Sequence, residues 1–197
     1  MTLHADSLAT LTGWTPPTDE QASLRDRYVA HLREHEDGMT RACFPDHLTA
    51  STLVVSRTAT RVLLTLHAKA GQWFQFGGHC EEADATLADA AWREASEESG
   101  IPDLALDPVP VHLSEHPVSF CDARGTVRHL DVRFVAVAND TAAHQVSDES
   151  LDVRWWPTAD LPNPDLGVLV ALARRRRQST SESGGDSRWA AADQPRR

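Results

Sequence analysis

Hydrophobic side chains in the first half of the chain occur in short runs separated by polar turns, which is typical of β-strands. Residues 49–56 and 61–67 are rich in aliphatic and β-branched side chains, and the polar residues between them predict a hairpin. Residues 73–76 predict a short third strand. This strand runs directly into a pair of glycines, Gly77 and Gly78.

Hydrophobic residues at helical spacing predict two amphipathic helices. The first covers Asp19 to His35, with apolar residues four positions apart, and a Thr-Asp-Glu-Gln capping box opens it. The second has an interior of good helix formers over residues 85–99. Asp84 or Thr86 can cap its start, and Gly100 supplies its stop.

Beyond residue 102 the pattern returns to strands. Residues 108–116 and 129–138 predict two strands joined by an Asp-Ala-Arg-Gly turn, and residues 151–156 predict another. Residues 166–177 predict a closing helix that becomes basic towards its end, which suits the helix dipole. Small and polar residues dominate after it, so we expect residues 178–197 to form a disordered tail.

The second predicted helix carries three carboxylates near its C-terminal end. At about 100° per residue, Glu94 and Glu98 fall within or beside its apolar arc, whereas Arg93 falls on the outer face. Glu94 and Glu98 form a like-charge pair that costs roughly 0.2–0.5 kcal/mol. Glu97 and Glu98 also meet the negative end of the helix dipole. Two interpretations remain: a solvated acidic face, or a bound cation.

The glycine pair favours the cation. Gly77-Gly78 allows a tight turn whose backbone carbonyl can approach an ion closely. Carboxylate and carbonyl oxygens suit a hard divalent ion, so the pattern predicts Mg²⁺, with Mn²⁺ as a substitute, rather than zinc.

The segment from Gly77 to Ile101 resembles the Nudix box of the Nudix (MutT-like) hydrolases, Gly-x5-Glu-x7-Arg-Glu-U-x-Glu-Glu-x-Gly-U, where U is a bulky aliphatic residue. The second half of the box, beginning at Arg93, fits almost throughout, with Ala95 as a small version of the first U. The first half departs. Asp84 stands where the isolated Glu is expected, and one extra residue separates it from Arg93.

The order of predicted elements resembles the Nudix fold as well. The resemblance implies an α/β (α+β) fold, a mixed β-sheet between helices, over residues 49–177. Residues 1–48 would then form an N-terminal helical extension. Its helix could cover a face of the sheet, border the substrate pocket or make a homodimer contact, and the sequence does not choose among these.

The resemblance also implies an activity, hydrolysis of the pyrophosphate bond of a nucleoside diphosphate linked to another moiety, such as an NTP, a sugar nucleotide or ADP-ribose. It assigns cation binding to Glu94, Glu97, Glu98 and the Gly78 carbonyl. Arg93 would orient Glu94 through a charge-assisted hydrogen bond. The altered front half of the box motivates an alternative, a Nudix-like nucleotide-binding or regulatory module with little or no turnover.

The general base could come from the helix or from a loop beyond the box. The strongest loop candidate is Glu149, just before the strand predicted at residues 151–156. The alternative is that Glu149 is an ordinary polar turn residue.

Contacts to the rest of the substrate depend on other loops. Phe76 and the neighbouring aromatic residues could stack on a base, or they could belong to the core. His79 could line a polar pocket or satisfy local hydrogen bonds. His129, Asp131 and Arg133 share one side of a predicted strand, so Arg133 could reach phosphate from a pocket wall or simply meet solvent.

The composition of the chain argues against nucleic acid and membranes as partners. The chain has 197 residues and 41% hydrophobic content, enough for one domain with a core. Its formal net charge of −10 argues against unspecific binding to nucleic acid or to an anionic membrane. There is no apolar run of membrane-spanning length and no secretory signal pattern at the start, so we expect a cytoplasmic protein that acts on a small-molecule nucleotide.

The three cysteines, Cys43, Cys80 and Cys121, are widely spaced and odd in number, so reduced thiols are expected. A sharper alternative is a zinc site in which the Cys43-x3-His47 pair meets the His79-Cys80 pair in space. Otherwise Cys43 and Cys80 are small buried hydrophobic residues.

Overall fold

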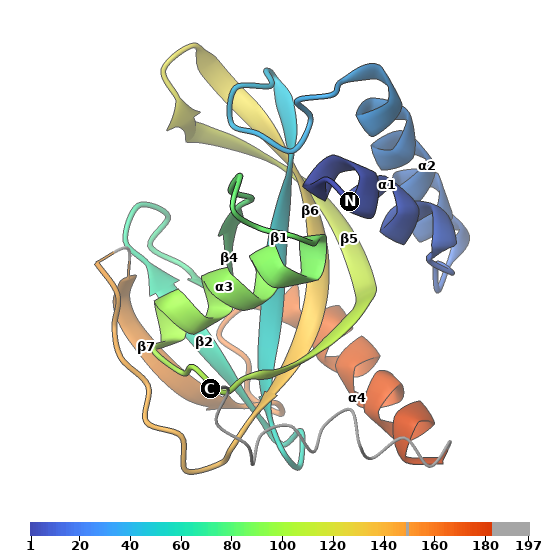
Figure 1. The fold of residues 1–197 in the computed structure, drawn as a ribbon. Coiled ribbons are helices and arrows are strands. Elements are labelled where there is room, and N and C mark those ends of the chain that lie inside the picture. The colour runs from blue at the N-terminus through green and yellow to red at the C-terminus, as the bar shows by residue number, and fades with distance from the viewer. Residues whose placement is uncertain (149, 183–197) are drawn as a thin grey trace.

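The structure is a computed structural model that describes residues 1–148 and 150–182 (Figure 1). Its helices and strands follow in the order α1 (Leu3–Gly13), α2 (Asp19–Glu34), β1 (Asp46–Ser56), β2 (Arg61–His67), β3 (Trp73–Phe74), β4 (Phe76–His79), α3 (Leu87–Ser99), β5 (Ala105–Asp122), β6 (Gly125–Ala138), β7 (Ser150–Pro157) and α4 (Leu166–Glu182).

Within the described residues, the strands form one seven-stranded mixed sheet of order β3-β2-β1-β6-β5, with β4 beside β1 and β7 beside β2. β1 pairs in parallel with β6 along its whole length. The other edge of β1 is shared: its first half pairs with β4, with Ala50 opposite Gly78, and its second half pairs with β2, with Val54 opposite Leu63. The sheet therefore divides beside the middle of β1, and β4 holds the glycine pair at that division.

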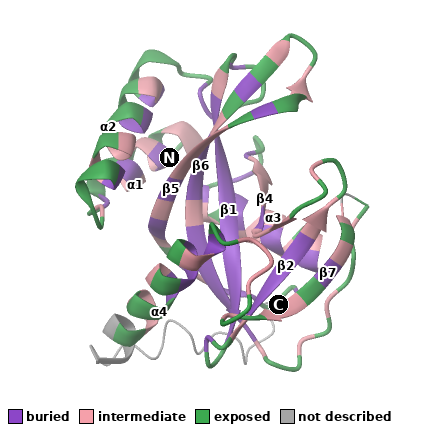
Figure 2. Cartoon of the chain, turned by 180° about the vertical axis from the view of Figure 1, so that it is seen from behind, coloured by how far each residue is buried: buried purple, intermediate pink, exposed green. Residues whose placement is uncertain are grey.

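Helices cover both faces of the sheet (Figure 1). α1, α2 and α3 share one core cluster with strand residues such as Leu48 and Val132, whereas α4 packs on a second cluster that includes Leu53 and Val135. Because side chains alternate along a strand, these two sets lie on opposite faces. Figure 2 shows the buried residues concentrated along β1 and β6 between these layers.

The α2 helix begins where the sequence predicts, with the Thr18 side chain accepting a hydrogen bond from the Gln21 backbone NH. Its Tyr28 and Leu32 side chains are fully buried in the core, and the Tyr28 hydroxyl donates to Ser114 O on β5 at 2.8 Å. Of the three roles considered for this helix, covering a face of the sheet is therefore the one that the structure shows.

The α1 helix was not predicted. Thr2 caps it by accepting from the Ala5 backbone NH, and the Leu11 side chain is completely buried. A cap residue followed by leucines at positions 3, 8 and 11 is the signal that could have revealed it.

The predicted strands are present, but only β2 keeps its predicted limits: β1 begins three residues early, at Asp46, and β7 is one residue longer at each end. The segment at residues 73–76 is divided between β3 and β4, and β5 and β6 are both longer than predicted because they pair with each other as far as Asp122 opposite Gly125. The α4 helix continues to Glu182, five residues beyond its predicted end, and residues 183–197 of the predicted tail lie outside the described residues.

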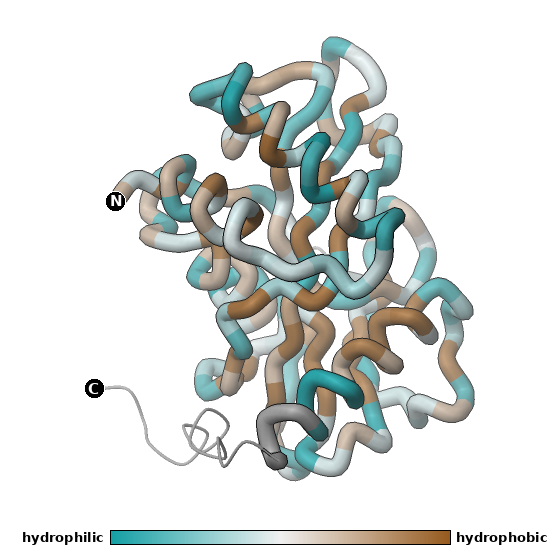
Figure 3. The backbone as a smooth tube through the Cα atoms, turned by 90° about the vertical axis from the view of Figure 1, so that its right-hand side faces the viewer, coloured by the Kyte–Doolittle hydropathy of each residue, from teal (hydrophilic) through white to brown (hydrophobic). Residues whose placement is uncertain are grey.

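Hydrophobic positions lie mainly within the body of the fold, and the outer loops are largely hydrophilic (Figure 3). Among the helices of the described residues, none is both long and apolar enough to span a bilayer.

Candidate functional site

The α3 helix carries the predicted carboxylates and is fixed at both ends. Thr86, rather than Asp84, is its N-cap, because the Thr86 side chain accepts from the Asp89 backbone NH. Gly100 ends it in the left-handed conformation at φ 69°. Ala91 and Ala95 are completely buried, and the Thr52 hydroxyl of β1 donates to Ala91 O at 2.9 Å. These small side chains allow the helix to lie close against the sheet.

Arg93 is the centre of the hydrogen-bond network at this helix. Its Nε and Nη2 donate to the two carboxylate oxygens of Asp84 at 3.0 and 3.1 Å. Nη1 donates to Glu94 Oε1 at 3.0 Å and to Glu97 Oε2 at 3.2 Å, and Nη2 also donates to His79 O at 2.9 Å. The guanidinium therefore ties the loop after β4 to two of the three helix carboxylates.

The prediction that Arg93 lies on the outer face of the helix is wrong. Its side chain is only 17% exposed because the loop after β4 folds back and places the buried Asp84 carboxylate against it. Asp84 also accepts from the Glu81 backbone NH at 2.8 Å, and its hydrogen bonds to Arg93 raise the pKa of that guanidinium further. Helical periodicity could not show this, because the partner lies outside the helix.

Gly78 provides the closest approach between backbone and carboxylate. A Cβ atom added at Gly78 would lie 2.7 Å from Glu94 Oε2 and 2.9 Å from Oε1, so only glycine lets the Glu94 carboxylate rest there. At Gly77, φ is 156° and an added Cβ would lie 2.3 Å from Ser51 Cβ. The first glycine is therefore required by backbone packing, and the second makes room for the Glu94 carboxylate.

Glu97 and Glu98 complete the acidic end of α3. The Glu97 side chain is 64% exposed, although one of its oxygens accepts from Arg93. Glu98 lies one turn after Glu94 and is half-buried. The atoms that could bind a metal here are carboxylate oxygens, and the backbone at Gly78 lies close beside them. Oxygen ligands of this kind fit a hard divalent cation. The space at Gly78 that a Cβ would fill is the structural observation that supports this fit.

Arg133 lies on the other face of the sheet. It pairs across the ladder with Ser51, whereas the next residue, Thr52, contacts α3. Its Nε donates to the buried Asp131 carboxylate at 2.9 Å, and Asp131 also accepts from the Ser51 hydroxyl at 2.8 Å. The polar side of β6 is thus a packed network, and the structure does not bring Arg133 together with the helix carboxylates.

Two further predicted residues have other surroundings. Of the two interpretations of Phe76, stacking on a base or a place in the core, the structure shows the second, because its side chain is completely buried in a hydrophobic cluster with Ala95 and Ile101. Glu149 lies outside the described residues.

The zinc set that was the alternative to reduced, unligated cysteines, Cys43 and His47 with His79 and Cys80, does not assemble. His47 and His79 do meet, with ring centroids 5.1 Å apart, but the thiol beside them is that of Cys121, whose Sγ lies 3.2 Å from His79 Nε2. Cys43 Sγ lies 3.9 Å from His31 Nε2, and Cys80 is buried in the core. Burial raises the pKa of the Cys80 thiol to about 12 and lowers that of His79 to about 3.

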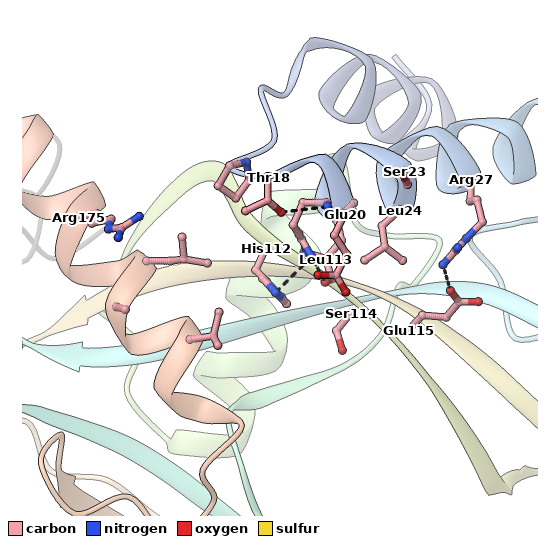
Figure 4. A pocket seen from close by; sticks show the side chains of 15 residues that line it. Thr18, Glu20, Ser23, Leu24, Arg27, His112, Leu113, Ser114, Glu115 and Arg175 are labelled. Atoms are coloured by element: carbon pink, nitrogen blue, oxygen red, sulfur yellow. Dashed lines mark hydrogen bonds and ion pairs between the residues drawn. The ribbon is translucent and has the colours of Figure 1, made fainter.

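A cavity of about 870 Å³ lies away from the carboxylates, between α2, β5 and α4 (Figure 4). Its polar lining includes a hydrogen-bonded pair, Gln21 and His112, with 3.2 Å between Gln21 Nε2 and His112 Nε2. Burial, followed by the charge of Arg133, lowers the pKa of His112 to about 4. Its other lining residues include Leu24, Arg27, Leu172 and Arg175.

Comparison with known proteins places these features in context. The family model described as NUDIX domain matches residues 45–176. No curated protein matches the chain.

Among solved structures, a NUDIX family hydrolase from Clostridium perfringens is 21% identical, with a TM-score of 0.49 over 65% of this chain and 95% of that one. The NUDIX domain of Shewanella oneidensis NrtR, complexed with ADP ribose, is 24% identical, with a TM-score of 0.48 over 75% of this chain and 96% of that one. The E. coli dihydroneopterin triphosphate pyrophosphohydrolase is 20% identical, with a TM-score of 0.49 over 57% of this chain and 81% of that one.

Proposed function

The chain belongs to the Nudix family, and from this premise we propose that it is a pyrophosphohydrolase that uses Mg²⁺ to cleave a small nucleoside diphosphate derivative at the acidic end of α3. Mn²⁺ would substitute for Mg²⁺ because it prefers the same oxygen ligands. The observation that carries this proposal is the position of the Glu94 carboxylate, which rests against Gly78 and accepts a hydrogen bond from Arg93.

We assign the cation ligands to Glu94, Glu97, Glu98 and the Gly78 carbonyl. When bound, the divalent ions would neutralise phosphate charge, activate water and stabilise the leaving oxygen. Arg93 is a positioning residue in this account. Its hydrogen bond to Glu94 Oε1 holds that carboxylate beside Gly78, and the two hydrogen bonds to Asp84 hold the guanidinium in turn.

The anchoring by Asp84 supports hydrolysis over the alternative of a module without turnover. That alternative rests on the altered front half of the box. Asp84 nevertheless makes two hydrogen bonds to Arg93 and is only 7% exposed, so the front half is engaged with the helix despite the shorter side chain and the extra residue.

Glu149 remains our candidate for the general base. The loop that precedes it is attached to the C-terminal end of α3, because the Gln145 backbone NH donates to Ser99 O at 2.8 Å. The loop of residues 139–148 therefore lies beside the end of α3 that carries Glu98, and this motivates the assignment. A helix carboxylate is the other source of the base.

We propose a nucleotide such as an NTP, a sugar nucleotide or ADP-ribose as substrate, and not nucleic acid, given the net charge of −10. Arg133 and His79 would contact it only if the non-phosphate part reaches the opposite face of the sheet. The three free cysteines are in keeping with the cytoplasmic location that we propose.

Product release from a panel of nucleoside triphosphates, sugar nucleotides, ADP-ribose and dinucleoside polyphosphates tests this function, with Mg²⁺ or Mn²⁺ and then with a chelator. We expect metal-dependent turnover of one class that Glu98→Gln abolishes and that Glu82→Gln, a matched change at an exposed residue before the helix, preserves. Metal-dependent turnover that is unchanged in Glu98→Gln would contradict the site. Nucleotide-dependent stabilisation without product would instead support the binding module.

A further inference from the structure

Three histidines and one cysteine converge at the end of the sheet where the β5–β6 hairpin begins. The ligand atoms of His47, His79, Cys121 and His129 all lie within 4.8 Å of one another. We propose that these four residues bind one zinc ion as a structural site, distinct from the Mg²⁺ site on α3. This inference does not depend on the proposed hydrolytic function.

The strand register explains why these side chains meet. His47 on β1 is directly opposite His129 on β6, and His79 on β4 is opposite Thr49, two residues along β1 on the same face. Cys121 reaches the same place because the β5–β6 pairing shifts register between Val118 and Asp122. The four ligands thus come from four strands that the sheet holds in fixed positions.

The distances fit tetrahedral zinc. Zn–N bonds of about 2.0 Å and a Zn–S bond of about 2.3 Å place nitrogen and sulfur about 3.5 Å apart in a tetrahedral site. The Cys121 Sγ atom lies 3.2 Å from His79 Nε2 and 3.4 Å from His129 Nε2. The imidazoles surround one point, with ring centroids separated by 5.0 to 5.1 Å among His47, His79 and His129.

His47 has one ring nitrogen that forms a hydrogen bond and one buried ring nitrogen that does not. Its side chain is 1% exposed, and its Nδ1 lies 3.1 Å from the Cys43 backbone oxygen. A carbonyl oxygen only accepts, so Nδ1 carries the proton and Nε2 presents a lone pair. Among the described residues, this buried Nε2 has no hydrogen-bond partner. Such a backbone bond is the usual support of a histidine that binds metal through its other nitrogen.

The charge around the thiol also suits a metal-bound thiolate. Arg41 Nη2 donates to the Cys121 backbone oxygen at 3.0 Å and lies 4.0 Å from Sγ. Zinc binds a cysteine in its thiolate form, and the Arg41 guanidinium lies beside the sulfur that would carry this negative charge. Nitrogen and sulfur ligands select zinc over Mg²⁺, for which the oxygen ligands of α3 are suited.

A second group, His35, Asp37 and Cys43, is the competing location for a metal in the described part of the chain. It offers three ligands, and two of these residues, His35 and Asp37, are exposed. The four-residue site is better enclosed, and Cys43 provides the matched comparison for Cys121 in an experiment.

Four protein ligands would leave no open position for a substrate, so the site is structural rather than catalytic. A bound zinc would also help to hold Gly78 and Arg93 in position, because His79 follows Gly78 directly and the His79 backbone oxygen accepts from Arg93 Nη2. Zinc would thereby link the β5–β6 hairpin to the loop that positions Glu94.

The test is the zinc content of the full chain, purified without chelators, together with the absorption spectrum after zinc is replaced by Co²⁺. We expect about one zinc per chain and a near-ultraviolet thiolate-to-cobalt band in the parent protein and in Cys43→Ser. Cys121→Ser should lose the band and bind zinc more than about 100-fold more weakly, since losing a ligand costs more than losing an outer partner.

Circular dichroism tests whether each variant is folded. If Cys121→Ser does not fold, His129→Gln removes a ligand instead. Glu98→Gln should retain zinc, which separates this site from the one on α3. Absence of stoichiometric zinc binding in the parent protein would overturn the proposal. So would zinc retained in both Cys121→Ser and His129→Gln, or lost in Cys43→Ser alone.

Discussion

Replacing Gly78 with alanine should weaken catalysis without unfolding the protein. The added Cβ would lie 2.7 Å from Glu94 Oε2, whereas an ordinary contact is at least 3.4 Å, so the carboxylate has to withdraw by about 0.7 Å. A displacement of about 1 Å at a catalytic group can cost about 100-fold in rate. We therefore expect kcat/KM to fall about 10- to 100-fold, or about 1.4–2.7 kcal/mol in transition-state stabilisation.

The stability of Gly78→Ala should change little, because the atoms that must move are the end of a flexible side chain. The assay is the hydrolysis rate on the best substrate of the panel, together with urea unfolding. Gly167→Ala, where an added Cβ meets nothing within 4 Å, is the control and should keep full activity. Full activity in Gly78→Ala would refute the account of how Glu94 is placed.

Three further perturbations test other parts of the account. Asp84→Ala should lower the free energy of unfolding by about 2–4 kcal/mol, measured in urea, because it leaves the largely buried Arg93 guanidinium without its main partner. It should still cost less activity than Glu98→Gln. A loss of stability below about 1 kcal/mol, as expected for a simple cap, would contradict the anchoring role of Asp84. Removing zinc with a chelator should lower Tm by about 5–10 °C, since zinc at about 100 times its Kd contributes about 2.7 kcal/mol, and calorimetry should show no such shift in Cys121→Ser. The pKa of His112 is about 4 in the folded protein and about 6.5 in the unfolded chain. As the pH falls, the unfolded chain therefore takes up the proton first, and stability is lost between these two values. His112→Gln should reduce the slope of the unfolding free energy against pH by up to about 1.4 kcal/mol per pH unit between pH 6.5 and 4. Equal slopes in the parent and the variant would show that His112 is not a buried neutral group.

The sequence predicts most of the fold because local signals agree with the final packing. The start of α2 follows from a cap, the whole of β2 from an aliphatic run, and the end of α3 from a left-handed glycine at residue 100. The end of β5 is different. Its residues from His116 to Asp122 have a weak strand pattern, and pairing with β6 is what keeps them extended.

The candidate site was predicted as a set of carboxylates with one orienting hydrogen bond, from Arg93 to Glu94, which the structure contains, but the part played by Asp84 was not predicted. The pattern Glu-x-x-Glu-Glu and the glycine pair are local, and the structure places Glu94 against Gly78. The contact between Arg93 and Asp84 depends on how a loop folds back, and periodicity assigns Arg93 to the wrong face for that reason. Cys121 and His129 meet His47 only through the register of nonadjacent segments, which the sequence does not display.

In the proposed function, the carboxylates at the end of α3 hold the divalent cation needed for hydrolysis. Electron paramagnetic resonance of Mn²⁺ titrated into the protein measures this binding directly, with the parent chain, Glu98→Gln and the matched Glu82→Gln compared under the same conditions. Our account predicts that Glu98→Gln weakens Mn²⁺ binding strongly and that Glu82→Gln binds like the parent. Equal Mn²⁺ binding in Glu98→Gln and the parent chain would contradict it.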